Sequence, residues 1–310
     1  MPELPDIETY VEALAERILG EPLLAVELKS PFLLRTAEPP ISQAANRLVR
    51  GVERLGKRVV IALEGDLFLV LHLMIAGRLH FTAEGGKKSA RGGHVLASFL
   101  FPKGRLTVTE AGKKRRAALH LVKGRAGLAA LARLGVEPLL VELATFAAAL
   151  KRENHTVKRA LVDPDLFAGI GNAYSDEILH RARISPLKLT GRLTDEEVER
   201  IHRATREVLT LFRARLREER AGGFPEKVTA FREDFAVHGR YRLPCPDCDA
   251  PVQRIVHGEH ETNYCPRCQT EGRILSDRSL ARLLKEDWPR TLEDLEQKAG
   301  FAVKSRPSVG

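Results

Sequence analysis

The sequence lacks any apolar run near the roughly 18 residues that a helix needs to cross a bilayer. It also lacks the basic stretch followed by an apolar segment that marks a secretion signal, because it begins MPELPD, with an acid and two prolines. We therefore expect a cytoplasmic protein that makes no contact with a membrane.

Cysteine is scarce: the 310 residues contain 4, arranged as two Cys-x-x-Cys pairs, Cys245 with Cys248 and Cys265 with Cys268. In a cytoplasmic chain this pattern excludes a disulfide framework and indicates metal binding. Sixteen residues separate the pairs, a spacing that lets four thiolates surround one tetrahedral zinc ion. Four cysteine ligands leave no position for water, so the expected zinc is structural. The segment that holds this zinc, a zinc ribbon, either only stabilises the fold or also contacts a ligand through the residues between the two cysteine pairs.

Acidic residues are outnumbered, 41 against 50 lysines and arginines, which gives a net charge of +9 and a pI of about 9.5. Such a balance favours a polyanionic partner, although a generally basic surface without a specific partner is the alternative. The sequence has no basic amphipathic helix with aromatic anchors, which argues against binding to a membrane surface.

The spacing of apolar residues predicts an α+β protein. Residues 6–19 place apolar side chains on one helical face, and the following segment to about residue 121 has the short alternating runs of strands. Residues 59–63 and 67–73 flank Glu64-Gly65-Asp66, a hairpin signal. We expect an N-terminal helix with a β-sandwich or barrel.

The second half has helical periodicity. Helices are expected at 156–167 and 172–181, joined by a turn with two glycines, and Thr194 opens a capping box for a helix ending near Arg220. Residues 251–264, between the cysteine pairs, predict a hairpin with Gly258 in its turn. We divide the chain into 1–125, a catalytic β-sandwich domain; 126–236, a helical domain; 237–272, a zinc ribbon; and 273–310, a tail.

Several motifs, in order along the chain, resemble the formamidopyrimidine-DNA glycosylase and endonuclease VIII family, in which this sequence looks like a divergent member. They are PELPDIET at 2–9, LGKR at 55–58, HLMIAG at 72–77, LGVEPL at 134–139, GIGNAYSDE at 169–177 and the cysteine ribbon. The resemblance implies a helix–two-turn–helix in the helical domain, and a base-excision-repair glycosylase with abasic-site lyase activity that removes oxidised bases from damaged DNA.

The resemblance assigns the nucleophile to Pro2, exposed once Met1 is removed. An α-amine has a pKa near ~8, so an appreciable fraction is neutral at physiological pH and can form a Schiff base with the sugar. Glu3 and Lys57 would manage protons, and Glu177 would support the pocket. Without the family match, Pro2 would be an ordinary terminal proline, Glu3 a helix-start acid and Lys57 a solvated strand-end lysine.

The resemblance further implies DNA contacts from three parts of the chain. Asn172 and Lys158 would hold phosphates at the helix–two-turn–helix, where a helix N-terminus also offers backbone amides. His72 either contacts DNA or is a buried structural histidine, and the two roles are equally plausible. The remaining candidates are Arg115, Arg116 and His260.

The sequence departs from the family pattern where members fill the void left by a flipped nucleotide. Ile75 stands where a methionine is usual, Ala117 where a phenylalanine is usual, and His260 where an arginine assists the second elimination. A weaker wedge should disfavour extraction from intact duplex. We therefore expect a preference for single-stranded or flexible lesions, abasic sites or oxidised pyrimidines over duplex 8-oxoguanine.

Two other functions compete with the enzyme. A noncatalytic protein on the same scaffold would bind damaged DNA without cutting it, and an unrelated zinc-ribbon interaction module would not distinguish damaged from intact DNA. The resemblance favours the enzyme, expected to be monomeric, of bacterial type and associated with the nucleoid.

Overall fold

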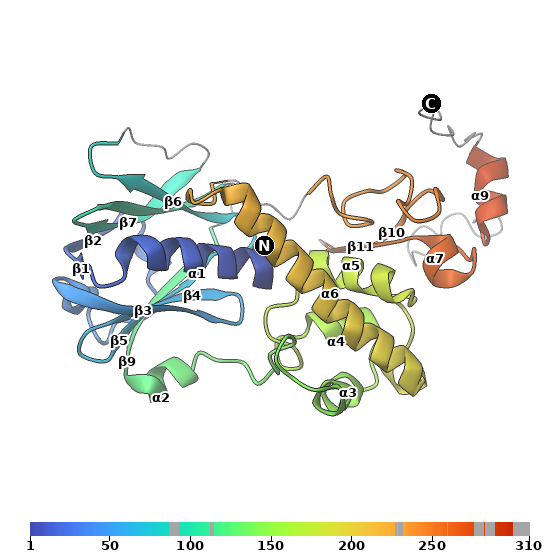
Figure 1. Ribbon diagram of the computed structural model, residues 1–310, viewed down its shortest axis with the longest axis horizontal. Coiled ribbons are helices and arrows are strands. Elements are labelled where there is room, and N and C mark those ends of the chain that lie inside the picture. Colours follow the sequence, from blue (N-terminus) through green and yellow to red (C-terminus); the bar gives the residue numbers. More distant parts are fainter. Residues whose placement is uncertain are drawn as a thin grey trace. The chain divides into compact units, whose positions relative to one another are not determined.

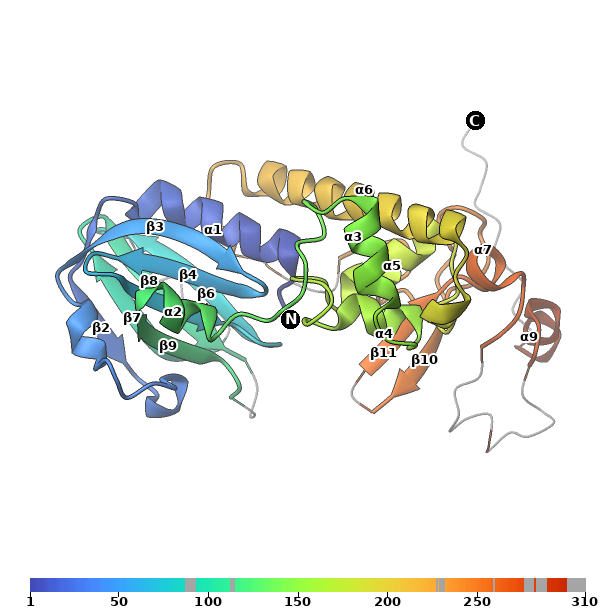
Figure 2. The same ribbon diagram turned by 90° about the horizontal axis from the view of Figure 1, so that it is seen from below.

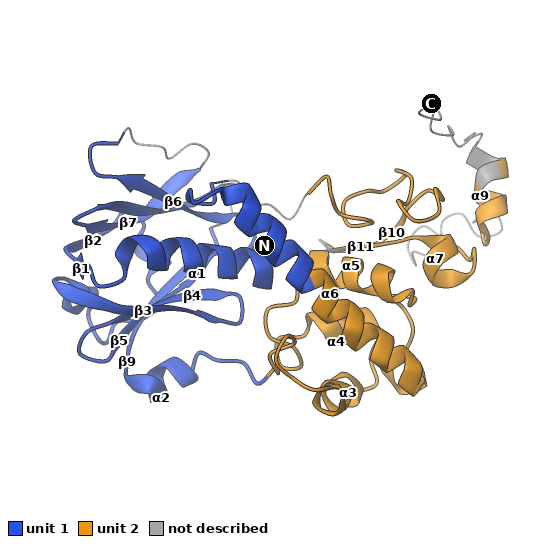
Figure 3. Cartoon of the chain, in the orientation of Figure 1, with its two compact units in different colours: residues 1–134, 209–230 blue, residues 135–208, 231–310 orange. Residues whose placement is uncertain are grey.

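The computed structural model describes residues 1–86, 93–111, 115–226, 228, 232–258, 260–275, 282 and 289–299. The chain forms two compact units: residues 1–134 with 209–230, and residues 135–208 with 231–310 (Figure 3). The long helix α6, Asp195–Arg220, contributes to both units. The four-part division of the sequence stays a prediction. None of the described helices is long and apolar enough to cross a membrane.

Helix α1, Leu4–Ile18, opens the first unit, starting two residues before the predicted position. The early start follows from a capping box in which the Glu3 N–H donates to the Asp6 carboxylate at 2.8 Å. Pro5, in the first turn, needs no N–H partner there. The side chains of Ile7, Tyr10, Leu14 and Ile18 are fully buried, which confirms the predicted apolar face.

Two antiparallel sheets enclose the core of the first unit (Figure 2). One has the order β1-β3-β4-β5-β9 and the other β2-β7-β8-β6, so the predicted α+β class with an N-terminal helix and β-sandwich is confirmed. The predicted hairpin at Glu64–Asp66 joins β4 to β5, with Leu63 paired to Leu67. The strands are β1 Pro22–Leu23, β2 Ala25–Leu28, β3 Arg47–Leu55, β4 Arg58–Leu63, β5 Leu67–His72, β6 Gly77–Ala83, β7 His94–Phe101, β8 Gly104–Glu110 and β9 Ala118–Lys123.

Within the first unit, α1 packs along β3 and is also bound by the last turns of α6 (Figure 1). Three arginines of α6 form ion pairs with three glutamates of α1: Arg213 with Glu8, Arg217 with Glu12 and Arg220 with Glu16. The glutamates are four residues apart and the arginines four and three apart, about one helical turn on each side. The pairs fix the helix that follows the chain's N-terminus. A short helix α2, Gly124–Ala129, closes the N-terminal segment of this unit.

The second unit begins with helices α3, Leu143–Lys151, α4, Val157–Val162, and α5, Asn172–Ala182. The expectation of helix to residue 167 was wrong: α4 ends at Val162, because Asp163 precedes a proline and takes an extended conformation with ψ of 116°. Helix α6 starts where predicted, with the Thr194 N–H donating to the Glu197 carboxylate at 3.0 Å.

The cysteine segment forms the predicted hairpin, β10, Gln253–His257, and β11, His260–Tyr264, with Gly258 at a φ of +61° in the turn. Helix α7, Pro266–Thr270, carries the last cysteine. A further helix, α9, Leu292–Ala299, follows it in the tail (Figure 1).

Candidate active site and metal centre

The N-terminal amine of the first unit lies among charged groups. Burial lowers the pKa of the Met1 amine below its ordinary 8.0, and nearby Arg78 and Lys57 lower it further, whereas Glu3 and Asp6 oppose the shift. Glu3 is 3% exposed and Pro2 is buried. Pro2, Glu3 and Lys57, which the sequence predicted as catalytic, therefore come together around the chain terminus. Arg78 was not predicted, although it follows directly on the HLMIAG motif.

Lys57 stands in a two-residue turn between β3 and β4, where Gly56 has a φ of +60°. A glycine adopts this conformation without strain. Burial lowers the pKa of Lys57, and the Glu3 carboxylate opposes that shift. The charges of Lys57 and Glu3 are thus close enough to influence each other.

His72 ends β5, paired with Arg58 on one side and Ala118 on the other. Burial, together with the charges of Arg58 and Lys57, lowers the pKa of His72 to about 4. The imidazole is therefore neutral near pH 7, and it offers a hydrogen bond rather than a charge.

A tight turn after His72 presents one apolar side chain to solvent. The Gly77 N–H donates to the Leu73 carbonyl at 2.9 Å, and Ile75 at the tip is 53% exposed. Met74 is only half-buried and has a φ of +53°. Ile75, the residue aligned with the family wedge, is thus the exposed one.

The predicted basic loop is described in part, because Lys113 and Lys114 lie outside the described residues. Arg115 and Arg116 are exposed. Both oxygens of the buried Glu110 accept the N–H groups of Arg116 and Ala117, at 2.9 to 3.3 Å. Ala117 is 3% exposed and belongs to the core, so no bulky wedge stands at this position.

In the second unit, Lys158 and Asn172 both belong to an internal network. The Lys158 ammonium, 8% exposed, donates to the Asp176 carboxylate, to the Ser175 Oγ at 3.2 Å and to the Asn172 carbonyl at 3.1 Å. The Asn172 side-chain amide donates to the Glu261 carbonyl at 2.8 Å. This geometry favours a role for Lys158 in positioning the start of α5. Direct phosphate contact by either residue stays a prediction.

Glu177 anchors the chain just before the zinc ribbon. Its carboxylate accepts the backbone N–H groups of Ala236 at 2.7 Å and of Val237 and His238 at 2.9 Å. Burial raises the pKa of Glu177, and the three donors oppose that shift. These contacts indicate that Glu177 positions the 236–238 segment; its support of a catalytic pocket stays a prediction.

Replacing Glu177 with glutamine should destabilise the protein. The amide turns N–H groups toward three backbone donors that need an acceptor, and losing hydrogen bonds to a buried charged group costs about 2 kcal/mol. Urea unfolding of Glu177→Gln measures the loss. Glu207→Gln is the matched control, because Glu207 forms a solvent-exposed pair with Arg181, which contributes little. Equal midpoints for the two variants would contradict this role of Glu177.

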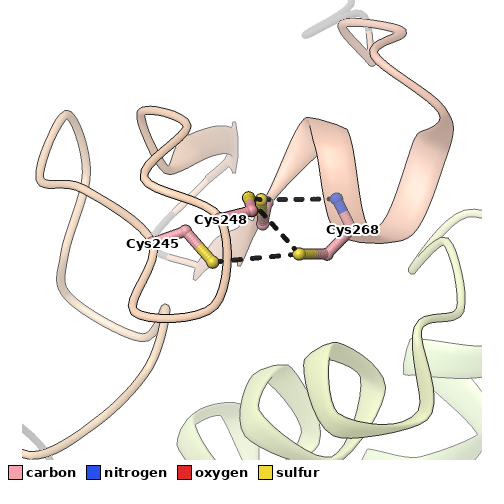
Figure 4. Close-up of side chains that lie close together, drawn as sticks. Cys245, Cys248 and Cys268 are labelled. Carbon is pink, nitrogen blue, oxygen red and sulfur yellow. Dashed lines mark hydrogen bonds between the residues drawn. The ribbon is translucent and has the colours of Figure 1, made fainter. Parts of the chain in front are cut away.

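The four cysteines form the metal centre. Their Sγ atoms lie within 4.8 Å of one another, with Cys245–Cys268 at 3.9 Å, Cys248–Cys265 at 3.4 Å and Cys248–Cys268 at 3.5 Å. Figure 4 shows the sulfur atoms turned toward one another. Tetrahedral zinc with Zn–S bonds of about 2.3 Å separates its sulfurs by about 3.8 Å, so the cluster fits one structural zinc ion, as predicted.

His260, the remaining predicted DNA contact, begins β11 opposite His257, and its side chain lies outside what the structure describes. Two groups that sequence reasoning missed are Asp176 and His238. The buried Asp176 carboxylate accepts from His238 Nδ1 at 2.8 Å and from the Asn263 N–H at 3.1 Å. Only the GIGNAYSDE motif could have pointed to Asp176.

Family models match three parts of the chain. The formamidopyrimidine-DNA glycosylase N-terminal domain matches residues 1–118. The formamidopyrimidine-DNA glycosylase H2TH domain matches residues 134–219. The zinc finger found in FPG and IleRS matches residues 242–270.

Among relatives, a formamidopyrimidine-DNA glycosylase of Thermus thermophilus is 37% identical over 285 residues, 88% of this chain and 100% of the relative. The crystal structure of a MutM (FPG) protein from Thermus thermophilus shares 34% identity, covers 86% of this chain and 98% of its own, and has a TM-score of 0.72. A MutM bound to DNA containing carbocyclic 8-oxo-G shares 25% identity, covers 87% of this chain and 100% of its own, and has a TM-score of 0.74.

Proposed function

Because this chain belongs to the formamidopyrimidine-DNA glycosylase family, and is thus a DNA glycosylase of base excision repair, we propose that it is also an abasic-site lyase acting through Pro2. The observation that supports this most is the environment of the chain terminus: the Met1 amine is half-buried near Glu3 and Lys57 with its pKa lowered, and Pro2, the next residue, is buried. An amine exposed in this environment by removal of Met1 would be more often neutral than a solvated one, and the neutral amine is the nucleophile.

The proposed reaction starts once Met1 is removed and the Pro2 nitrogen is a secondary amine. This nitrogen attacks the sugar C1′ of the damaged nucleotide, the bond to the base breaks, and the base leaves with a proton. Ring opening gives an iminium ion between Pro2 and C1′. The iminium acidifies the C2′ proton. When a proton acceptor removes this proton, the 3′ phosphate is expelled. Water then hydrolyses the iminium and frees Pro2.

Glu3 and Lys57 divide the proton transfers. Glu3, directly after the nucleophile, can take the proton that the Pro2 amine loses and deliver a proton to the ring oxygen as the sugar opens. The positive charge of Lys57, which interacts with Glu3, would stabilise the carboxylate and the negative charge that develops on the leaving groups.

Binding of damaged DNA would use groups from both units. In the first unit, the neutral His72 could donate a hydrogen bond to a phosphate, and the positively charged Arg115 and Arg116 could pair with phosphates. In the second unit, the N-terminus of α5 at Asn172 could donate hydrogen bonds to a phosphate. His260 stays a candidate from the ribbon. A monomeric state and a cytoplasmic, nucleoid-associated location remain part of this proposal.

The substrate preference follows from the exposed tip at Ile75 and the core position of Ala117. A branched apolar side chain alone gives a weaker wedge than the set of bulky residues usual in the family. We therefore keep the preference for single-stranded, flexible, abasic or oxidised-pyrimidine lesions over duplex 8-oxoguanine.

A lesion panel with borohydride trapping tests the proposal. We expect the protein to become covalently attached to DNA containing an abasic site, because borohydride reduces an iminium to a stable amine. The alternative function, a noncatalytic binder of damaged DNA, predicts retention without attachment. A strong preference for duplex 8-oxoguanine over the matched single strand would refute the substrate preference while leaving the chemistry in place.

The pH dependence of trapping should follow the amine. Because burial lowers the pKa of the amine at the present terminus, Met1, we expect the same environment to lower the pKa of the Pro2 amine; the trapping rate should rise with pH, with a midpoint below 8. Arg78→Met removes a positive charge that lowers this pKa, so the midpoint should move to higher pH. Arg105→Met, which affects a sheet arginine paired with Glu27, serves as control. A wild-type midpoint at or above 8 would argue against a desolvated nucleophile.

A further inference from the structure

The zinc centre is bordered by residues outside the matched zinc finger, residues 242–270, among them His180 and Leu292. His180 of α5, 4% exposed, places Nε2 3.2 Å from the Cys245 Sγ. Leu292 of α9, also 4% exposed, belongs to the same apolar cluster as Cys245 and Cys265. One contact is a hydrogen bond to a thiolate, and the other is apolar cover.

The tail holds Leu292 in place by backbone hydrogen bonds to the segment that follows the finger. The Ile274 N–H donates to the Arg290 carbonyl at 2.9 Å, and the Leu292 N–H donates to the Gly272 carbonyl at 2.8 Å. Helix α9 then starts with a local cap, in which the Asp294 carboxylate accepts the Thr291 N–H at 3.1 Å. Leu295, one turn after Thr291, packs against the same cluster.

Helix α5 contacts the ribbon along its length. Besides His180 near its end, Asn172 at its start donates to the Glu261 carbonyl at 2.8 Å, and Asp176 in the middle accepts the Asn263 N–H at 3.1 Å. These positions are four residues apart, so they lie on one helical face. The zinc ligand Cys245 is thereby joined to the helix that carries Glu177.

We propose that His180 and the α9 segment form an outer layer that retains the zinc ion. Donation by the His180 N–H to the Cys245 Sγ fixes the orientation of this ligand, which favours the metal-bound arrangement. Leu292 and Leu295 exclude the water and chelators that compete for the ligands. This inference concerns the metal centre alone and does not depend on the reaction proposed for Pro2.

Transfer of zinc from the intact full-length protein to the chromogenic chelator 4-(2-pyridylazo)resorcinol measures retention without any activity assay. His180→Phe keeps an aromatic ring of similar size but removes the donor, and loss of an outer-layer hydrogen bond should speed release roughly tenfold or more. His180→Gln, whose amide can donate, should restore part of the retention. Leu292→Ala should also speed release, because it opens the apolar cover.

Two matched variants control for general effects on the second unit. His202→Phe removes another histidine hydrogen bond, to the Val141 carbonyl at 3.1 Å, and Leu187→Ala truncates a leucine that is 43% exposed. Both should release zinc at the wild-type rate. Far-UV circular dichroism verifies that each variant is folded, and a folded variant purified with less than one zinc per chain counts as accelerated loss.

Release from folded His180→Phe within about twofold of wild type, well below the change expected for an outer-layer partner, would overturn the role of His180. The same result for Leu292→Ala would overturn the role of α9. If His180→Gln released zinc as fast as His180→Phe, donation to the thiolate would be refuted, because Gln keeps the hydrogen-bonding capacity.

Discussion

A Pro2→Leu variant should lose trapping on abasic DNA and strand cleavage, by roughly a thousandfold or more, as when a covalent nucleophile is removed. The bulky residue at position 2 disfavours removal of Met1, so the terminal amine stays primary and lies one residue farther out. Single-turnover cleavage of abasic DNA measures the loss, and mass spectrometry verifies that Met1 is retained.

The matched measurement for Pro2→Leu is binding to an uncleavable abasic analogue. We expect little change in affinity, because phosphate contacts dominate binding to DNA and Pro2 is buried. Undiminished trapping by protein that retains Met1 would show that another amine is the nucleophile, and Lys57 would then be the first candidate because burial lowers its pKa.

Glu3→Gln should slow excision of a damaged base by about a hundredfold to ten-thousandfold, the usual contribution of a general acid–base group. Cleavage at a preformed abasic site should fall less, because no base has to leave. The substitution keeps the helix start, since the Glu3 backbone N–H still donates to Asp6 and the glutamine carbonyl oxygen can replace the carboxylate as acceptor of the Asp6 N–H in the capping box. Single-turnover rates on the two substrates give the comparison.

Glu12→Gln is the control for Glu3→Gln on the same helix. Glu12 forms a partly exposed ion pair with Arg217, so its loss should leave both rates unchanged. Equal excision rates for Glu3→Gln and wild type would remove Glu3 from the proton transfers and leave only its place at the helix start.

Local patterns of the sequence predicted most of the fold. The Thr194 and Glu197 pair marked the start of α6, and the cysteine spacing marked the metal centre, because capping and metal ligation involve residues near in sequence or of distinctive type. The end of α4 was also written in the sequence, since Asp163 precedes a proline, but helical periodicity outweighed that signal.

Contacts between distant residues were not predictable from local patterns. Glu177 accepts N–H groups about sixty residues further along the chain, and backbone donors carry no residue-specific signal. Likewise, Lys158 was expected at a phosphate from the family match alone, whereas the structure pairs it with Asp176. A lysine has the same sequence signal whether its ammonium meets DNA or a buried carboxylate.

The turn from His72 to Gly77 contains one position that is restricted to glycine, Gly77, and one that tolerates other side chains, Ile75. A Cβ on Gly77 would lie 2.2 Å from the Leu73 carbonyl oxygen, a clash with backbone that no flexible side chain can relieve. Ile75, in contrast, points into solvent at the tip, and surface positions tolerate exchange at little cost in stability. On the wedge role proposed for Ile75, exchanging this one outward side chain would change which damaged nucleotides are extracted, while Gly77 would preserve the shape of the turn.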